Sequence, residues 1–140
     1  SRLTPIWDDA VADLVGKMVD IEDFGEHRAL AVIDRNGVFA AGLVFNNWNP
    51  KAETIEISAA AVNPRWATRS VLRYALNYAF EVCGCQMTVA RTHEDNTRTR
   101  RLWLALGADE YVIPRLRGRN ASEAVHTLTK EAWAASRFMK

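Results

Sequence analysis

Residues 57–70, ISAAAVNPRWATRS, decide how this chain folds, because they predict a buried strand that passes through a short turn directly into a helix. Residues 57–62 continue an alternating strand that starts at Glu53, and Asn63-Pro64 ends it. From Ser70 to Cys83 apolar residues recur at steps of three and four, which predicts a helix over 70–83. Gly84 follows at the position of a C-terminal cap glycine.

The start of this helix predicts an anion-binding site. The first turn of a helix leaves backbone N–H groups without partners and carries a partial positive charge of about half a unit. Arg65, Arg69 and Arg73 would reinforce that charge, and a pyrophosphate is the natural ligand. Many strand–helix junctions share these features without binding an anion, so an ordinary surface turn is the alternative interpretation.

The rest of the pattern predicts an α/β (α+β) domain with a mixed sheet. The pair Asn36-Gly37 between two apolar runs indicates a hairpin, which makes a three-stranded meander with the strand over 53–62. The expected order is helix, three strands, helix, strand, helix, two strands and helix. The other expected helices cover 6–19, 97–106 and 129–138, and the other expected strands cover 29–33, 38–45, 87–90, 111–113 and 124–128.

Composition favours a single soluble domain over residues 1–140. The chain has 18 Lys+Arg, 17 Asp+Glu and 49% hydrophobic residues, enough for one sizeable core. A net charge of +1 argues against a dedicated nucleic-acid-binding protein, and charged residues interrupt every apolar run, so neither a membrane span nor a signal peptide is expected. Cys83 and Cys85 lie too close together for a disulfide framework, so we expect a cytoplasmic protein. The two cysteines lack the second pair of ligands that a zinc site needs, so we expect no metal site.

A second segment, residues 96–108 with the sequence NTRTRRLWLALGA, identifies a resemblance. Together with the strand–helix junction, this segment resembles the GNAT family of acyl-CoA-dependent N-acetyltransferases. It is most similar to the branch of ribosomal-protein and amino-group (Rim-type) acetyltransferases. The resemblance covers about residues 29–134 and implies the GNAT fold, a mixed, mostly antiparallel sheet of six or seven strands with helices on both faces. The matching residues are Tyr78-Ala79-Phe80, Asn96, Thr99, Arg101, Leu102, Leu106-Gly107-Ala108 and the ending Leu128–Trp133.

The resemblance also implies where acetyl-CoA and an amine acceptor bind. In the family the pantetheine arm inserts between two splayed strands, and the following turn and helix start hold the pyrophosphate. Asn96 would then face the pantetheine or the attacking amine, and Arg101 the nucleotide phosphates or a structural carboxylate. The expected cofactor-binding residues are Ala61, Val62, Arg65, Trp66, Ala67, Thr68, Arg69, Ser70, Asn96 and Arg101.

Glu56 and Asn96 are the expected catalytic residues. Glu56 lies on the polar face of the third strand, where GNAT enzymes often place a glutamate that deprotonates the amine through water. A solvated strand residue with alternating neighbours would look the same in sequence. Glu53 and His93 are weaker candidates for the general base.

Two departures from the family pattern leave a second function open. The turn 65–70 has no glycine and places Trp66 near the expected phosphate, and Trp103 stands where many members have a tyrosine that protonates the leaving thiolate. The first hypothesis is an acetyltransferase that moves an acetyl group from acetyl-CoA to a protein N-terminus or a small-molecule amine by direct attack. The alternative is an inactive GNAT-fold module that binds a protein partner or a second copy, with Trp66 filling the cleft between the splayed strands.

Overall fold

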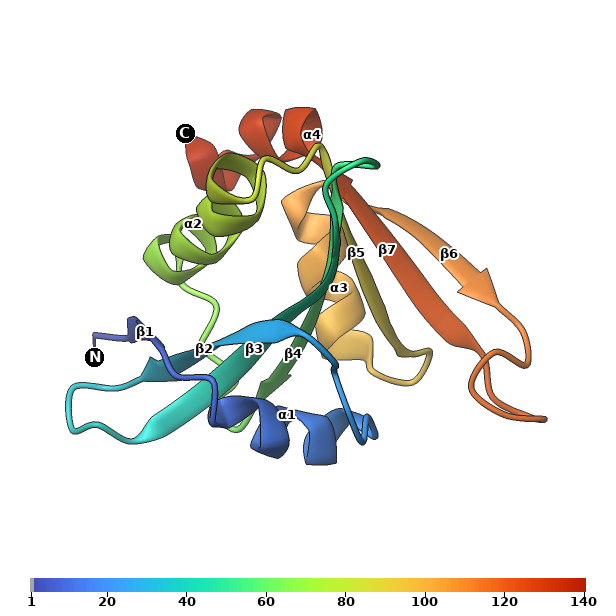
Figure 1. The fold of residues 1–140 in the computed structure, drawn as a ribbon, viewed down its shortest axis with the longest axis horizontal. Helices are drawn as coiled ribbons and strands as arrows, with labels where there is room; N and C mark the ends of the chain where they lie inside the picture. The colour runs from blue at the N-terminus through green and yellow to red at the C-terminus, as the bar shows by residue number, and fades with distance from the viewer. Residues whose placement is uncertain (1) are drawn as a thin grey trace.

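A seven-stranded mixed sheet with helices on both faces makes up the computed structural model, which describes residues 2–140 (Figure 1). The strand order is β1-β2-β3-β4-β5-β7-β6, and every neighbouring pair is antiparallel except β4 and β5. The strands are β1 (Thr4–Trp7), β2 (His27–Ile33), β3 (Phe39–Asn49), β4 (Thr54–Ala61), β5 (Met87–His93), β6 (Asp109–Ile113) and β7 (Glu123–Thr129). The helices are α1 (Val11–Val19), α2 (Arg69–Asn77), α3 (Thr97–Leu106) and α4 (Lys130–Ala135). The expected fold class is therefore confirmed.

The N-terminal segment corrects one expectation. The predicted helix over 6–19 is wrong at its start, because Thr4–Trp7 forms strand β1 on β2 and α1 begins only at Val11. Pro5 has no backbone N–H to donate, and an edge strand such as β1 tolerates it. Trp7 packs against Phe45 with ring centroids 5.8 Å apart, so its apolar character reflects the core beside the sheet and not a helical face.

The predicted hairpin and the predicted second helix both form. The Asp34 carboxylate accepts hydrogen bonds from the backbone N–H groups of Asn36 and Val38 at 2.8 and 2.9 Å, which fixes the turn between β2 and β3. Helix α2 continues into a π-helical turn, Tyr78–Val82, where the Cys83 N–H donates to the Tyr78 carbonyl at 2.9 Å. The expected single helix over 70–83 is thus an α-helix with a wider last turn.

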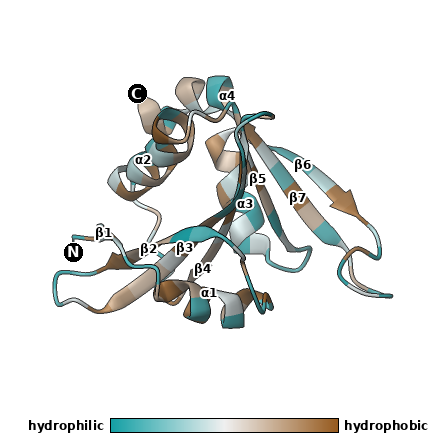
Figure 2. Cartoon of the chain, in the orientation of Figure 1, coloured by the Kyte–Doolittle hydropathy of each residue, from teal (hydrophilic) through white to brown (hydrophobic). Residues whose placement is uncertain are grey.

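Separate hydrophobic cores cover the two faces of the sheet. Helices α2, α3 and α4 pack on one face, and α1 alone packs on the other, where Val15 contacts the core around Val44 (Figures 1 and 2). The main contacts of helix α1 with the sheet are to β2, β3 and β4. None of the helices described is long and apolar enough to cross a membrane.

Strands β4 and β5 are paired over only three residues each, Thr54–Glu56 with Met87–Val89. Beyond that point β4 stays paired with β3 as far as Ala61, and β5 stays paired with β7 as far as His93. The two halves of the sheet therefore spread apart like the arms of an inverted V (Figure 1). Alternate backbone groups of β4 from Ile57 to Ala61 face this opening with no strand partner among the residues described.

We predict that Gly42→Ala destabilises the fold by about 1–3 kcal/mol through overpacking. A Cβ at Gly42 in β3 would lie 2.5 Å from Val15 Cγ2 and 2.7 Å from Val11 Cγ1 of α1. Urea unfolding of Gly42→Ala, Val15→Ala and the double variant measures this. The double variant should lose less stability than the sum of the two single variants, and simple additivity would contradict the proposed close contact.

Candidate active site

The divergence of β4 and β5 opens two cavities that meet. The helix-side cavity, about 450 Å³, lies between β4 and helices α2 and α3. The open-side cavity, about 720 Å³, lies on the α1 face of the sheet. Both are lined by Ile57, Ala59, Asn96, Thr99 and Trp103, so together they form one passage through the sheet at the splay.

Asn96, one of the two expected catalytic residues, lines both cavities. It is the N-terminal cap of α3, and its Oδ1 accepts a hydrogen bond from the Thr99 N–H at 3.3 Å. The cap bond leaves the side-chain amide group free to donate toward the passage. Arg101, by contrast, is exposed and lines neither cavity, so the structure does not bring it together with Asn96.

Both tryptophans at the unusual positions line the helix-side cavity without closing it. Trp66 is 7% exposed and packs in the core with Val71 and Leu72 of α2. Trp103 is 6% exposed and lines both cavities. The indole of Trp66 therefore forms a wall of the cleft and leaves room beside it.

The residues predicted to bind phosphate, in the turn between β4 and α2, have different structural roles. Thr68 caps α2, its Oγ1 accepting from the Val71 N–H at 3.3 Å, and Ala67 packs against the core. The N–H groups of Arg69 and Ser70, in the first turn of α2, have no partner within a helix. Arg65 is exposed, as are Ala61 and Val62 at the end of β4.

Two arginines near this turn are engaged elsewhere. Arg69 donates from Nη1 to the Lys140 carbonyl at 2.7 Å, and Arg73 donates from Nε to the Phe138 carbonyl at 2.9 Å. Both side chains thus secure the C-terminal 3₁₀ turn, Arg137–Met139, against α2.

Arg2 and Arg35 lie beside the start of α2, which the sequence pattern did not indicate. They line an open hollow together with Leu3, Thr68 and Ser70. Arg2 precedes β1 and Arg35 lies in the β2–β3 hairpin, so no spacing in the sequence connects them with the turn. The structure therefore places two cations and two hydroxyl groups at the helix start.

Glu56 lines the open-side cavity at the last paired position of β4 and β5. Its side chain is half-buried, and Oε1 accepts a hydrogen bond from the Asn47 amide at 3.2 Å. His93 lines the same cavity, whereas Glu53 lies before β4 and lines neither one. Of the glutamates considered, only Glu56 has access to the passage.

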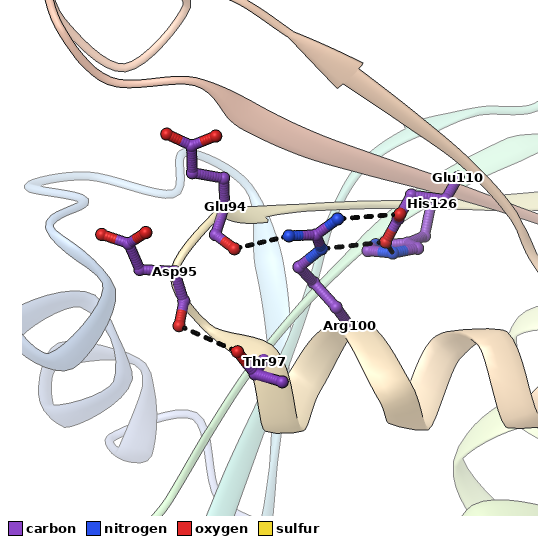
Figure 3. A network of polar contacts seen from close by, with 6 residues as sticks. All are labelled: Glu94, Asp95, Thr97, Arg100, Glu110 and His126. Atoms are coloured by element: carbon purple, nitrogen blue, oxygen red, sulfur yellow. Dashed lines mark hydrogen bonds and ion pairs between the residues drawn. The ribbon is translucent and has the colours of Figure 1, made fainter.

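A partly buried ionic network fixes α3 against the sheet (Figure 3). Arg100 binds the Glu110 carboxylate through Nε and Nη2 at 3.0 and 2.9 Å, and donates from Nη1 to the Glu94 carbonyl at 2.7 Å. Nε2 of the fully buried His126 lies 2.8 Å from Glu110 Oε2, the oxygen that also accepts from Arg100 Nε. The Arg100 guanidinium and His126 lower the pKa of Glu110 from 4.5 to about 2. The network secures the turn that carries Asn96.

A second ionic cluster, Arg91–Glu123–Arg117, forms one wall of the open-side cavity. The Glu123 side chain is 8% exposed, and its two oxygens lie 3.1 Å from Arg91 Nε and 3.2 Å from Arg117 Nη1. Arg117 also donates to the Val19 carbonyl at 3.4 Å, which ties the loop 114–122 to the end of α1. Within residues 2–140, no group of three or more His, Cys, Asp or Glu side chains is arranged to hold a metal ion.

The parting of two parallel strands above a cleft defines an acetyltransferase-like fold, and comparison with known proteins assigns the family. The model of the acetyltransferase (GNAT) family matches residues 3–108, so the chain belongs to the GNAT family. The comparison with curated proteins gave no match.

Solved structures with this fold include two of a polyamine acetyltransferase from Vibrio cholerae. Mutant forms of the spermidine/spermine N-acetyltransferase SpeG share 12% identity over 94% of this chain and 97% of that chain, with a TM-score of 0.73. A dodecameric spermidine N-acetyltransferase from the same organism shares 12% identity over 95% and 96%, also with a TM-score of 0.73. At this identity the likeness shows the fold.

We predict that Glu110→Gln destabilises the protein at pH 7 and that the difference from wild type shrinks in acid. The folded-state pKa of Glu110 is depressed, so its stabilisation is complete above pH 4.5 and is lost as pH falls toward 2. Thermal unfolding between pH 7 and pH 2.5 measures the difference. The exposed neighbour Asp109 gives the control Asp109→Asn, and a pH-independent gap for Glu110→Gln would contradict the assignment.

Proposed function

We propose that this protein transfers an acetyl group from acetyl-CoA to an amine. The observation that carries the proposal is the passage through the sheet at the splay of β4 and β5, with a cavity on either side. Two reactants can enter from opposite faces and meet beside Ala59 and Asn96. The similarity of the Asn96–Leu102 segment to Rim-type acetyltransferases supports the same chemistry.

Acetyl-CoA would enter from the helix side and supply an activated acyl group as a thioester. The unpaired edge of β4 from Ile57 to Ala61 offers backbone donors and acceptors to the pantetheine amides. The hollow beside the start of α2, with Arg2, Arg35 and the hydroxyl of Ser70, suits the phosphates. Apolar walls at Trp66 and Trp103 exclude water from the reacting group.

The acceptor amine would enter from the open side, where Glu56 takes its proton. Asn47 holds the Glu56 carboxylate by a hydrogen bond, so its orientation is fixed before the amine arrives. Nitrogen attacks the thioester carbonyl, the C–S bond breaks, and CoA leaves as a thiolate. No tyrosine lines either cavity among residues 2–140, so the thiolate leaves without a phenolic donor and is protonated by water.

An inactive binding module is less well supported. That alternative expects Trp66 to fill the cleft, but Trp66 packs into the core and a cavity of about 450 Å³ lies beside it. The lack of glycine in the turn 65–70 is accommodated because the Trp66 side chain points away from the helix start and into the core.

The first test is thermal unfolding with and without acetyl-CoA at matched ionic strength. A ligand at about 100 times its Kd adds about 2.7 kcal/mol, which raises the Tm of a domain of this size by several degrees. Ala59→Leu, which fills the passage, should abolish the shift. Ala105→Leu, on the exposed face of α3, should keep it. Absence of a shift in the wild-type protein at millimolar acetyl-CoA would overturn the proposal.

A second test concerns the general base. We expect Glu56→Gln to lower kcat/KM by about 100-fold or more, the usual contribution of a positioned base. Acetyl-CoA binding should be unchanged, because Glu56 lines only the open-side cavity. Glu53→Gln, which removes the same charge outside both cavities, is the matched control. Equal activity of Glu56→Gln and wild type would remove Glu56 from the mechanism.

A further inference from the structure

Charged side chains of both signs line the open-side cavity. Asp20, at the end of α1, and Glu56, on β4, are negative. Arg91, Arg117 and Glu123 form a cluster whose charges sum to one positive charge. Across the opening between β4 and β5, the negative Glu56 and the positive Arg91 therefore line the same cavity.

An acidic and a basic segment meet at the mouth of this cavity. Asp20 begins the acidic segment 20–26, which also contains Glu22, Asp23 and Glu26. Arg117 lies in the basic segment 115–119, between Arg115 and Arg119. The bond from Arg117 to the Val19 carbonyl holds the two segments side by side at the mouth.

Arg91 has hydrogen-bond donors that the protein itself does not use and that a ligand can bind. Its Nε faces Glu123, and its side chain is 50% exposed. Within the part of the chain that the structure describes, its two Nη groups have no hydrogen-bond partner among other residues. Arg117, in contrast, uses both Nη atoms, on Glu123 and Val19.

Arg91 and Glu56 lie on the same face of the sheet. Glu56 is in register with Val89, and Arg91 follows two residues later on β5, so its side chain points to the same face. The two side chains therefore flank the opening of the passage from its two strands, one with a proton acceptor and the other with unused guanidinium donors.

Resting on the function proposed above, we infer that the acceptor is an amine that also bears a carboxylate, such as an α-amino acid. The amine binds near Glu56, and the carboxylate binds the Nη groups of Arg91. A single excess positive charge matches one carboxylate, and a bidentate Arg–carboxylate pair fixes the direction of the acceptor. A polyamine carries cations at every nitrogen and would place one of them against Arg91.

The experiment measures acetylation by the full chain through release of the CoA thiol. The acceptors tested are the amino acids, the amide of each amino acid, and spermidine. Each amide keeps the amine of its amino acid and removes the carboxylate charge. For the preferred amino acid, kcat/KM should exceed that of its amide by about tenfold or more, the contribution of a hydrogen bond to a charged group. Preference for spermidine, or equal use of acid and amide, would overturn the inference.

Variants at Arg91 test the residue itself. Arg91→Gln should remove the discrimination between acid and amide, Arg91→Lys should retain part of it, and Arg91→Glu should turn the preference toward spermidine. Arg119→Gln is the matched control, because it removes the same charge from a side chain that lines neither cavity. Unchanged discrimination in Arg91→Gln would contradict the inference, and circular dichroism checks that each variant is folded.

The experiments distinguish failure of the proposed acetyltransferase activity from failure of the inference about the acceptor. If acetyl-CoA produces no thermal shift and no amine is acetylated, both proposals fall. If acetyl-CoA binds and no amine turns over, calorimetric binding of each acid and its amide to the CoA-saturated protein decides the inference, since the carboxylate contact needs no chemistry. Tighter binding of the acid, lost in Arg91→Gln, supports it, and equal binding overturns it.

Discussion

The site depends on one constraint, the loss of hydrogen bonding between β4 and β5 after three paired residues on each strand. A continuous parallel sheet would satisfy its own backbone and leave no passage. Unpaired backbone groups away from water are costly, so the open edge of β4 is stable only because solvent or a ligand can reach it. The two cavities are the direct consequence of this parting.

Side-chain interactions make α3 and one half of the sheet a single unit. Arg100 binds Glu110 on β6 and the Glu94 carbonyl before α3, and Glu110 in turn contacts His126 on β7. These bonds fix the β5–β7–β6 half and α3 as one unit. Trp103 of this unit is buried and lines the opening beside β4. The same unit carries Asn96, so the geometry of the passage and the stability of the α3 attachment are coupled.

The sequence predicted local features well and long-range pairings poorly. The apolar spacing over 97–106 predicts helix α3 with its observed bounds, because that signal is local, and the structure shows Asn96 and Gly107 as its two caps. Strand β1 was missed, because four residues with Pro5 carry no alternating signal and form a strand only when β2 is beside them. The Arg91–Glu123 contact joins residues on β5 and β7, and nothing in the spacing of the two indicates that antiparallel pairing brings them together.

The turn 65–70 shows why a missing motif need not mean a missing function. Glycine is required in a phosphate-binding turn where a Cβ would collide with the ligand or where φ is positive, and residues 65–70 have no positive φ. Trp66, the one bulky apolar side chain of the turn, is directed into the core, while Thr68 satisfies the helix start by its own cap. The cations beside that start come from Arg2 and Arg35, since Arg69 is bound to the C-terminal segment. In the proposed phosphate site the positive charge comes from two other parts of the chain, and only the fold brings them together.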